Sequence, residues 1–258
     1  MATIVMSPTE YVKQARLPDD VMMRGVHRDG FDTAQAALAT AEQQAVVVGS
    51  GILNFVDGVT PERRQAIVNS ALLAQLVARR QVPDARQVDA WYDAYFDVLA
   101  HLGWVIQDQG FAEYREASDD FTAHKAIIAV ATALLGPAPT ALALVTTTLN
   151  ALLSMGQDDP WIRIFSRESQ SASVARFQIG LVEKGADDAF RVGLMAFALE
   201  ASSEITQVLF FKARSATVSF RHRSGEVTID ADVLDSAREA MRLKLAGLAS
   251  SYVAALEI

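Results

Sequence analysis

Four side chains that can bind a metal ion or transfer protons recur at every fourth position in the middle of the chain. They are Asp89, Asp93, Asp97 and His101. On a helix this spacing places all four on one side, where carboxylates and an imidazole could hold a hard metal ion with help from elsewhere. The apolar residues Trp91, Tyr95 and Leu99 lie on the opposite side. We therefore interpret the row as a solvated acidic face and assign no metal ligand to it.

A second concentration of charge lies between 212 and 223, where basic side chains gather in an otherwise acidic chain. If this segment is a strand, alternation places Arg221 and Arg223 on one face and His222 on the other. Ordinary surface charge explains this pattern, and a patch that binds an anion or an acidic partner is the alternative. The residues of the alternative patch are Lys212, Arg214, Arg221 and Arg223.

Motifs of cofactor binding and catalysis are incomplete or missing. The segment Val46-Val47-Val48-Gly49-Ser50-Gly51 has the first two glycines of a dinucleotide-binding turn, but Asn54 replaces the third. Because an alanine-rich segment precedes it, we predict a helix that ends at Gly49. The sequence contains no Walker-type phosphate loop, no G-x-S-x-G elbow and no H-E-x-x-H pair. We assign no catalytic, cofactor-binding or metal-binding residue and expect a non-enzymatic protein without a cofactor.

The composition restricts the partners of the chain. Its 258 residues include 51% hydrophobic side chains, which is typical of a folded protein. The net charge of −8 opposes binding to a phosphate backbone, so we expect no nucleic-acid partner. Cysteine is absent, which excludes disulfides and thiolate chemistry. The first residues lack the pattern of a secretory signal, so cytoplasmic residence is the default expectation and signal-less export is the alternative.

The most unusual segment is an uncharged run from Ala126 to Gln157, interrupted by Gly136-Pro137-Ala138-Pro139. It predicts a hairpin of two apolar helices, over 126–135 and 140–153. These helices would reach about 15 and 21 Å, less than the roughly 30 Å of a bilayer's hydrocarbon core. Such helices are typically the buried centre of a bundle; contact with a membrane or an apolar ligand is the alternative. The candidate contact residues are Ile127, Ile128, Leu134, Leu135, Leu142, Leu144 and Leu149.

Helix caps and apolar spacing place the remaining elements. We predict helices that begin near residues 8, 34, 61, 85, 119 and 140, followed by a serine-rich connector over 166–173. Alternating residues then predict one strand pair around 177–181 and 192–197, and a second pair with its turn at Ser224-Gly225. A final helix is predicted from about Asp232 to Ala255.

The predicted fold class is α+β. An N-terminal bundle of about six helices (1–156) is followed by an antiparallel sheet of about four strands and a C-terminal helix (157–258), within one structural unit over 1–258. The leading functional hypothesis is a non-enzymatic binding or interaction protein, and its sharpest version is a membrane-active, toxin-like protein that releases the apolar hairpin.

Two other functional hypotheses stay beside it. One is a carrier or enzyme for an apolar small molecule or lipid, with a pocket lined by the hairpin, Trp104, Phe111 and Phe121. The other is a self-assembling structural subunit that uses a sheet edge or the final helix. The expected partners are accordingly a protein or a second copy of the chain, with a lipid membrane as the alternative.

Overall fold

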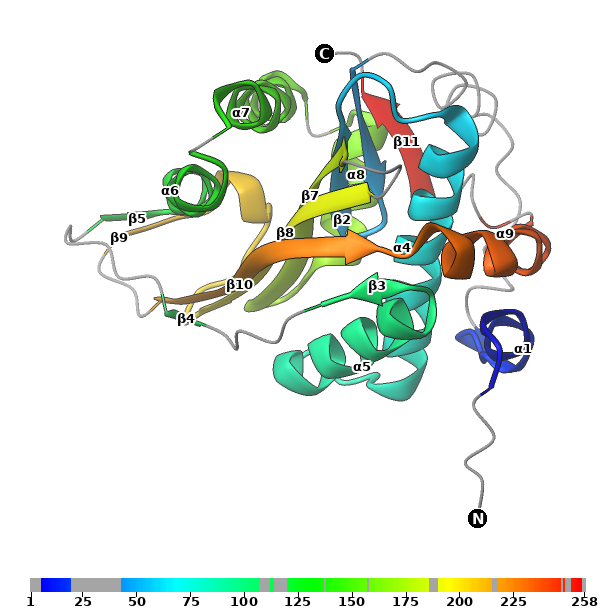
Figure 1. Ribbon diagram of the computed structural model, residues 1–258. Helices are drawn as coiled ribbons and strands as arrows, with labels where there is room; N and C mark the ends of the chain where they lie inside the picture. Colours follow the sequence, from blue (N-terminus) through cyan, green and yellow to red (C-terminus); the bar gives the residue numbers. More distant parts are fainter. Residues whose placement is uncertain are drawn as a thin grey trace.

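The computed structural model describes residues 6–19, 43–106, 112–113, 120–136, 138–156, 158–185, 190–214, 218–246, 248 and 252–256. These parts of the chain form seven α-helices, one large mixed sheet and a small second sheet (Figure 1). The helices are α1 (Pro8–Gln14), α4 (Pro61–Gln81), α5 (Val88–His101), α6 (Ala123–Leu135), α7 (Pro139–Ser154), α8 (Pro160–Ser169) and α9 (Ala231–Leu245). A short 3₁₀ helix, η3 (Val208–Phe210), follows β8 along the chain.

The large sheet has the strand order β11-β1-β2-β7-β8-β10-β3. These strands are β1 (Gln44–Val48), β2 (Gly51–Phe55), β3 (Trp104–Val105), β7 (Val174–Lys184), β8 (Phe190–Ala201), β10 (Val218–Ile229) and β11 (Val253–Leu256). The short strands β4 (Ala112–Glu113) and β6 (Gln170–Ser171) pair with β10 and β7, while β5 (Asp120–Thr122) pairs with β9 (Lys212–Arg214) in the small sheet. Neighbours run antiparallel except β2 and β7, which are parallel and place Ile52 opposite Ile179.

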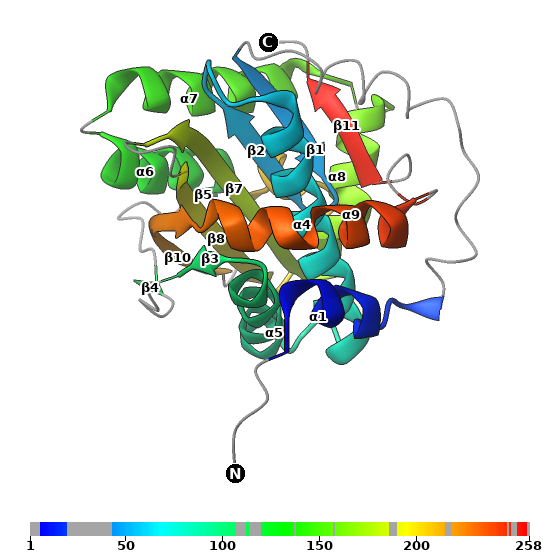
Figure 2. The same cartoon turned by 45° about the vertical axis from the view of Figure 1, so that its right-hand side comes forward.

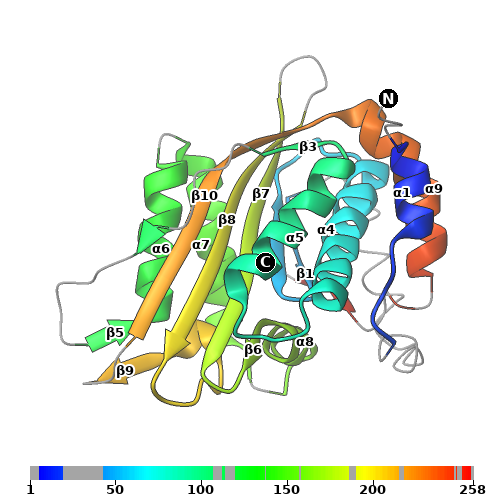
Figure 3. The same cartoon turned by 90° about the horizontal axis from the view of Figure 1, so that it is seen from below.

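Helices cover both faces of the large sheet (Figures 2 and 3). On one face lie α4, α5 and α9, with α1 packed on α9, and on the other lie α6, α7 and α8. Alternate side chains of β7 and β8 therefore belong to different cores. Phe177 and Phe197 pack on the α6–α8 side, whereas Val182 and Val192 pack on the α4–α5 side. The long apolar runs of these strands are typical of strands buried on both faces.

The predicted N-terminal helical bundle is wrong. Residues 44–55 form the β1–β2 hairpin inside the large sheet rather than a helix that ends at Gly49, and the earlier part of that predicted helix lies outside the described residues. The three β-branched residues Val46, Val47 and Val48 favour a strand, and because every residue of β1 is buried, the alternation that marks an amphipathic strand is missing. The parallel β2–β7 pair also corrects the prediction of a purely antiparallel sheet of about four strands.

Three later boundaries differ as well. Ser224-Gly225 is no turn, because β10 continues through it and pairs with β8 along its whole length. The predicted serine-rich connector contains the end of α8. The final helix ends at Leu245, and residues 253–256 pair with β1 instead, which covers an edge that a longer helix would leave without hydrogen bonds.

Other predicted elements are present. Helices occupy 8–14, 61–81, 88–101 and 139–154, and the predicted strands around 177–181 and 192–197 are β7 and β8, paired as a hairpin. The helix expected from about residue 119 begins at Ala123, because 120–122 pair with β9.

A buried glutamine of α4, Gln75, forms hydrogen bonds to the turn between β1 and β2. Gly49 adopts a φ of +55°, a value that glycine reaches without strain. The side chain of Gln75 accepts a hydrogen bond from the Ser50 backbone N–H at 3.0 Å and donates one to the Val48 carbonyl at 2.9 Å. A Cβ atom at position 49 would lie 2.2 Å from Gln75 Oε1. The turn and the glutamine therefore require each other.

Gly49→Ala tests this dependence. We expect it to lower the free energy of unfolding by about 2 to 4 kcal/mol, because backbone strain adds to the displacement of a buried hydrogen-bonding group. Gly58→Ala is the matched control, since Gly58 also has a positive φ, +86°, but a Cβ there meets nothing within 4 Å. In the control, backbone strain alone should lower the free energy of unfolding, by about 1 to 2 kcal/mol. Equal losses in urea titrations of the two variants would show that Gln75 does not constrain the turn.

Candidate functional site

The helical hairpin α6–α7 is the outer layer on one face of the sheet (Figure 3). Lys125 lies in its first turn, and from Ala126 to Gly156 the sequence contains no charged residue. Proline at the first position of α7 fixes a backbone angle that suits a helix start. The hairpin therefore combines a defined bend with an uncharged surface along both helices.

The seven contact residues predicted in this hairpin divide into two groups. Ile127, Leu135, Leu144 and Leu149 are buried against the sheet. Ile128, Leu134 and Leu142 are partly buried and pack at the rim of the same core. After Lys125, the outward surface has uncharged side chains at the exposed positions Ala129, Thr132, Ala133, Pro139, Thr140, Ala143, Thr147 and Asn150. Beyond the exposed Lys125 in its first turn, both surfaces of the hairpin lack charge, the inner one being strongly apolar and the outer one weakly polar.

A buried polar pair connects the hairpin to the sheet. The Thr148 hydroxyl of α7 donates a hydrogen bond to Asn54 Oδ1 of β2 at 2.6 Å, and Asn54 Nδ2 donates to the Gly180 carbonyl of β7 at 3.1 Å. Both side chains are at most 1% exposed. The residue that breaks the dinucleotide-binding pattern is therefore a link between the two parallel strands and the hairpin.

The hairpin also approaches the sheet closely at one glycine. A Cβ atom on Gly193 of β8 would lie 2.9 Å from Cδ2 of Leu135 at the end of α6. Real Cβ atoms do not come this near to another carbon, so the Leu135 side chain would have to shift to admit a larger residue. Close packing, rather than ion pairing, holds this end of the hairpin in place.

The acidic row and the basic patch of the sequence lie against each other on the opposite layer. Arg221 pairs with Asp89 at 3.0 Å and with Glu200 at 3.2 Å, and Arg223 pairs with Asp93 at 3.3 Å. Asp89 and Asp93 thus pair with β10 but stay 59% and 68% exposed, so the row lies at a solvated surface, as the sequence indicates. Lys212 is exposed on β9, and the side chain of Arg214 lies outside the described residues. Among the described residues no three metal-binding side chains gather.

The aromatic residues suggested for an apolar pocket do not share one. Trp104 belongs to the core under α4 and α5, where its indole N–H donates to the Ser70 hydroxyl at 3.1 Å. Phe121 packs at the rim of the other core, and Phe111 lies outside the described residues. The sheet separates the two described rings.

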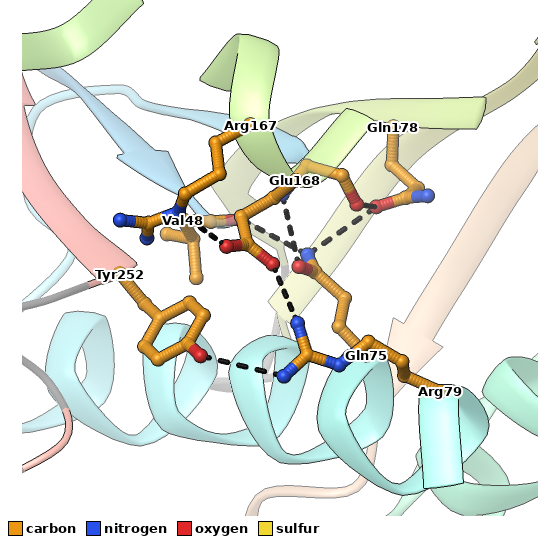
Figure 4. A network of polar contacts seen from close by, with 8 residues as sticks. Val48, Gln75, Arg79, Arg167, Glu168, Gln178 and Tyr252 are labelled. Carbon is orange, nitrogen blue, oxygen red and sulfur yellow. Dashed lines mark hydrogen bonds and ion pairs between the residues drawn. The ribbon is translucent and has the colours of Figure 1, made fainter. Parts of the chain in front are cut away.

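A cluster of arginines near the end of α4 escaped the sequence analysis (Figure 4). Glu168 of α8 accepts hydrogen bonds from Arg79 of α4 at 3.0 Å and from its neighbour Arg167 at 2.6 Å. The Tyr252 hydroxyl lies 3.5 Å from Arg79. Only the pairing of β1 with β11 and the packing of α8 bring these distant positions together. The Arg167-Glu168 dipeptide lies within the predicted connector, and no motif or spacing in the sequence indicates that it belongs to a site.

A buried network joins this region to α5. Gln75 donates to Gln178 of β7 at 3.3 Å, and Gln178 donates to the Tyr92 hydroxyl at 3.2 Å. That hydroxyl in turn lies 2.9 and 2.7 Å from the carbonyls of Phe177 and Phe197. Burial raises the pKa of Tyr92, so it remains a neutral donor. The network positions strands and offers no catalytic group to solvent.

Comparison with known proteins identifies no family for this chain and only distant structural similarity. No protein-family model matches the chain, and no curated protein matches it. Two solved structures are distantly similar. A delta-endotoxin is similar with a TM-score of 0.32 and 10% sequence identity. The similarity covers 73% of this chain and 87% of the endotoxin chain. The Evf virulence factor has a TM-score of 0.31 and 12% identity, over 91% of this chain and 90% of its own. At TM-scores this low, no functional inference rests on either.

The helices themselves set one limit on membrane contact. In the parts of the chain that the structure describes, none is both long and apolar enough to cross a bilayer.

Thr148→Val tests the polar link between hairpin and sheet. Valine has nearly the same shape, but it leaves Asn54 Oδ1 buried without its donor, so we expect a loss of about 1 to 3 kcal/mol in the free energy of unfolding. The adjacent Thr147 is exposed, and Thr147→Val should change stability by less than about 0.5 kcal/mol. Urea unfolding of both variants measures the difference, and equal stabilities would contradict a stabilising role for the pair.

Proposed function

We propose that this chain is a membrane-binding, toxin-like protein in which the α6–α7 hairpin leaves the sheet and enters the bilayer. The observation that supports this proposal is the absence of charged residues from Ala126 to the end of α7, on both surfaces of an outer helical hairpin whose lysine, Lys125, lies in the first turn of α6. The net charge of the chain is −8. Elsewhere on the described surface, exposed helices such as α5 and α9 carry charged residues at regular intervals.

Transfer of the hairpin from Ala126 onward into lipid would bury no charged side chain, and Lys125 in the first turn of α6 can keep its ammonium group at the membrane interface. A charged side chain at the centre of a transmembrane helix costs about 2.5 to 3.5 kcal/mol or more, whereas alanine, leucine and isoleucine enter readily. The exposed threonines can satisfy their hydroxyls by donating to the carbonyl one turn earlier, as Thr132 does to Ile128 at 2.8 Å. The outer surface is thus compatible with water and with lipid.

The inner surface decides when the hairpin leaves. Exposing a buried leucine or isoleucine to water costs about 1.5 to 3 kcal/mol, so the hairpin stays on the sheet in solution. A bilayer offsets that cost for the hairpin's own side chains, because they are buried again in hydrocarbon, while the apolar sheet face that the hairpin covered becomes exposed. At 13 and 16 residues, α6 and α7 are about 20 and 24 Å long, shorter than the roughly 30 Å hydrocarbon core. We therefore propose shallow insertion that disturbs a leaflet, rather than two spanning helices.

Charges placed on the outer surface test the proposal. Ala129 and Ala143 are exposed, so Ala129→Glu with Ala143→Glu should leave the fold in water intact but add about 2 kcal/mol or more per glutamate to insertion. We expect binding to neutral phosphatidylcholine vesicles in a flotation assay, and dye release from them, to fall at least about tenfold.

The matched control carries the same two charges on the opposite layer. Ala90 and Ala100 are exposed on α5, and Ala90→Glu with Ala100→Glu should bind and release dye as the unmodified protein does. If both double variants behave alike, or if the unmodified protein does not bind vesicles, the hairpin is not the membrane-contacting element.

A covalent lock distinguishes release of the hairpin from surface contact. The chain has no cysteine, and the side-chain oxygens of Asn54 and Thr148 are 2.6 Å apart, so Asn54→Cys with Thr148→Cys introduces a single thiol pair between β2 and α7. We expect the oxidised form, verified by loss of free thiol, to release no dye, and reduction to restore release. Equal release in both redox states would contradict detachment of α7 from the sheet.

A further inference from the structure

A pocket lies where the end of α4, the end of α8 and the start of β7 meet, away from the hairpin. Its volume is about 230 Å³, and its lining includes Arg79, Arg167 and Arg176 together with one acidic residue, Glu168. Among the described lining residues, three guanidinium groups face one carboxylate, a formal excess of two positive charges, in a chain whose net charge is −8. An excess of this kind attracts anions into a confined space.

The arginines are held in fixed positions. Glu168, whose side chain is only 9% exposed, bridges Arg79 and Arg167 at 3.0 and 2.6 Å. The guanidinium of Arg167 lies 5.3 Å from the centre of the Tyr252 ring. That of Arg176 lies 4.6 Å from the centre of the Trp91 ring. Aromatic rings that support guanidinium groups in this way reduce the freedom that would be lost when a ligand binds.

Two buried donors of the pocket have no protein partner among the described residues. Arg176 donates through Nη1 to the Ala85 carbonyl at 3.2 Å, but its Nε is buried without a hydrogen bond. Ser169 also lines the pocket, is only 2% exposed, and its hydroxyl is buried without a hydrogen bond. Buried donors are rarely left without an acceptor, because each one costs about 1 to 3 kcal/mol. Both residues line the pocket, so rotation of the two side chains toward it would let a ligand with several acceptor oxygens satisfy both donors.

The surroundings of Arg176 also disfavour the charged form of its guanidinium group. Burial, together with the nearby Arg79, lowers the pKa of Arg176. The guanidinium nevertheless remains protonated at neutral pH. A bound anion would offset the repulsion between Arg176 and Arg79.

We propose that this pocket is a binding site for a phosphate group, with Arg176 and Ser169 as direct donors. A phosphate has enough oxygens for several donors and up to two negative charges, which match the excess of the pocket, whereas a carboxylate supplies one charge. The volume is smaller than that of ordinary small-molecule pockets, about 300 to 1,000 Å³, so the group that enters is small. The site is independent of the hairpin and of its entry into membranes.

Calorimetric titration with inorganic phosphate tests the site, with chloride at equal ionic strength as the reference. We expect saturable binding by the unmodified protein and at least about tenfold weaker binding by Arg176→Met, because a charge-assisted hydrogen bond is lost. Arg163→Met is the matched control, since Arg163 is exposed on α8 and does not line the pocket, and its affinity should be unchanged.

Ser169→Ala provides a second variant in case Arg176→Met does not fold. The Ser169 hydroxyl has no partner among the described residues, so the fold should tolerate its loss, while phosphate affinity should fall about two- to tenfold. No saturable binding by the unmodified protein would overturn the proposal. So would equal phosphate affinities for the unmodified protein and the pocket variants.

A second experiment distinguishes a lipid headgroup from free phosphate as the source of the phosphate group. Vesicles of phosphatidylcholine with and without phosphatidic acid present the same group as a lipid headgroup. If phosphatidic acid strengthens binding and Arg176→Met removes that gain, the pocket takes a headgroup. If inorganic phosphate binds and the phosphatidic acid content has no effect, the pocket takes phosphate from solution.

Discussion

Most residues of β7 and β8 are buried, and apolar side chains point to both faces of these two strands, so both faces must be kept from water. This constraint accounts for the arrangement of the rest of the chain. Helices α4, α5 and α9 cover one face, and α6, α7 and α8 cover the other, so two separate cores form around one sheet. Adding β2 in parallel beside β7 extends the sheet, and the crossover that a parallel pair requires is supplied by the helices between them in the chain.

Polar groups fix the register inside this apolar sheet. Gln75, Gln178 and Tyr92 connect the turn of the β1–β2 hairpin to β7 and α5, while Asn54 joins β2 to both β7 and α7. Because a buried donor or acceptor without a partner is costly, a shift of β2 by one residue along β7 would be unfavourable. Apolar packing makes the sheet stable, and these few hydrogen bonds make its pairing unique.

The two helical layers differ in how they are attached. The layer that contains α5 is joined to β10 by ion pairs, such as those of Arg221 and Arg223, and carries many charges at its surface. The α6–α7 hairpin rests on the sheet through apolar packing and a buried hydrogen bond from Thr148, and its outer surface has no charge beyond Lys125 in the first turn of α6. A layer attached in this manner can exchange the sheet for a lipid environment without separating charges. The arginine pocket lies apart from it, at the junction of α4, α8 and β7.

Local sequence determined the elements whose signal does not depend on distant contacts. Ser7 before Pro8 caps the first helix, Pro61 and Pro139 begin two others, and the uncharged run marks the hairpin whatever surrounds it. Tertiary structure decided the identity of β1, because a fully buried strand and an apolar helix have the same composition when no alternation is exposed. It also decided that Ser224-Gly225 continues a strand, since pairing with β8 outweighs local turn preference. The arginine pocket depends on side chains from separate parts of the chain, and such proximity is created only when the sheet and helices pack together.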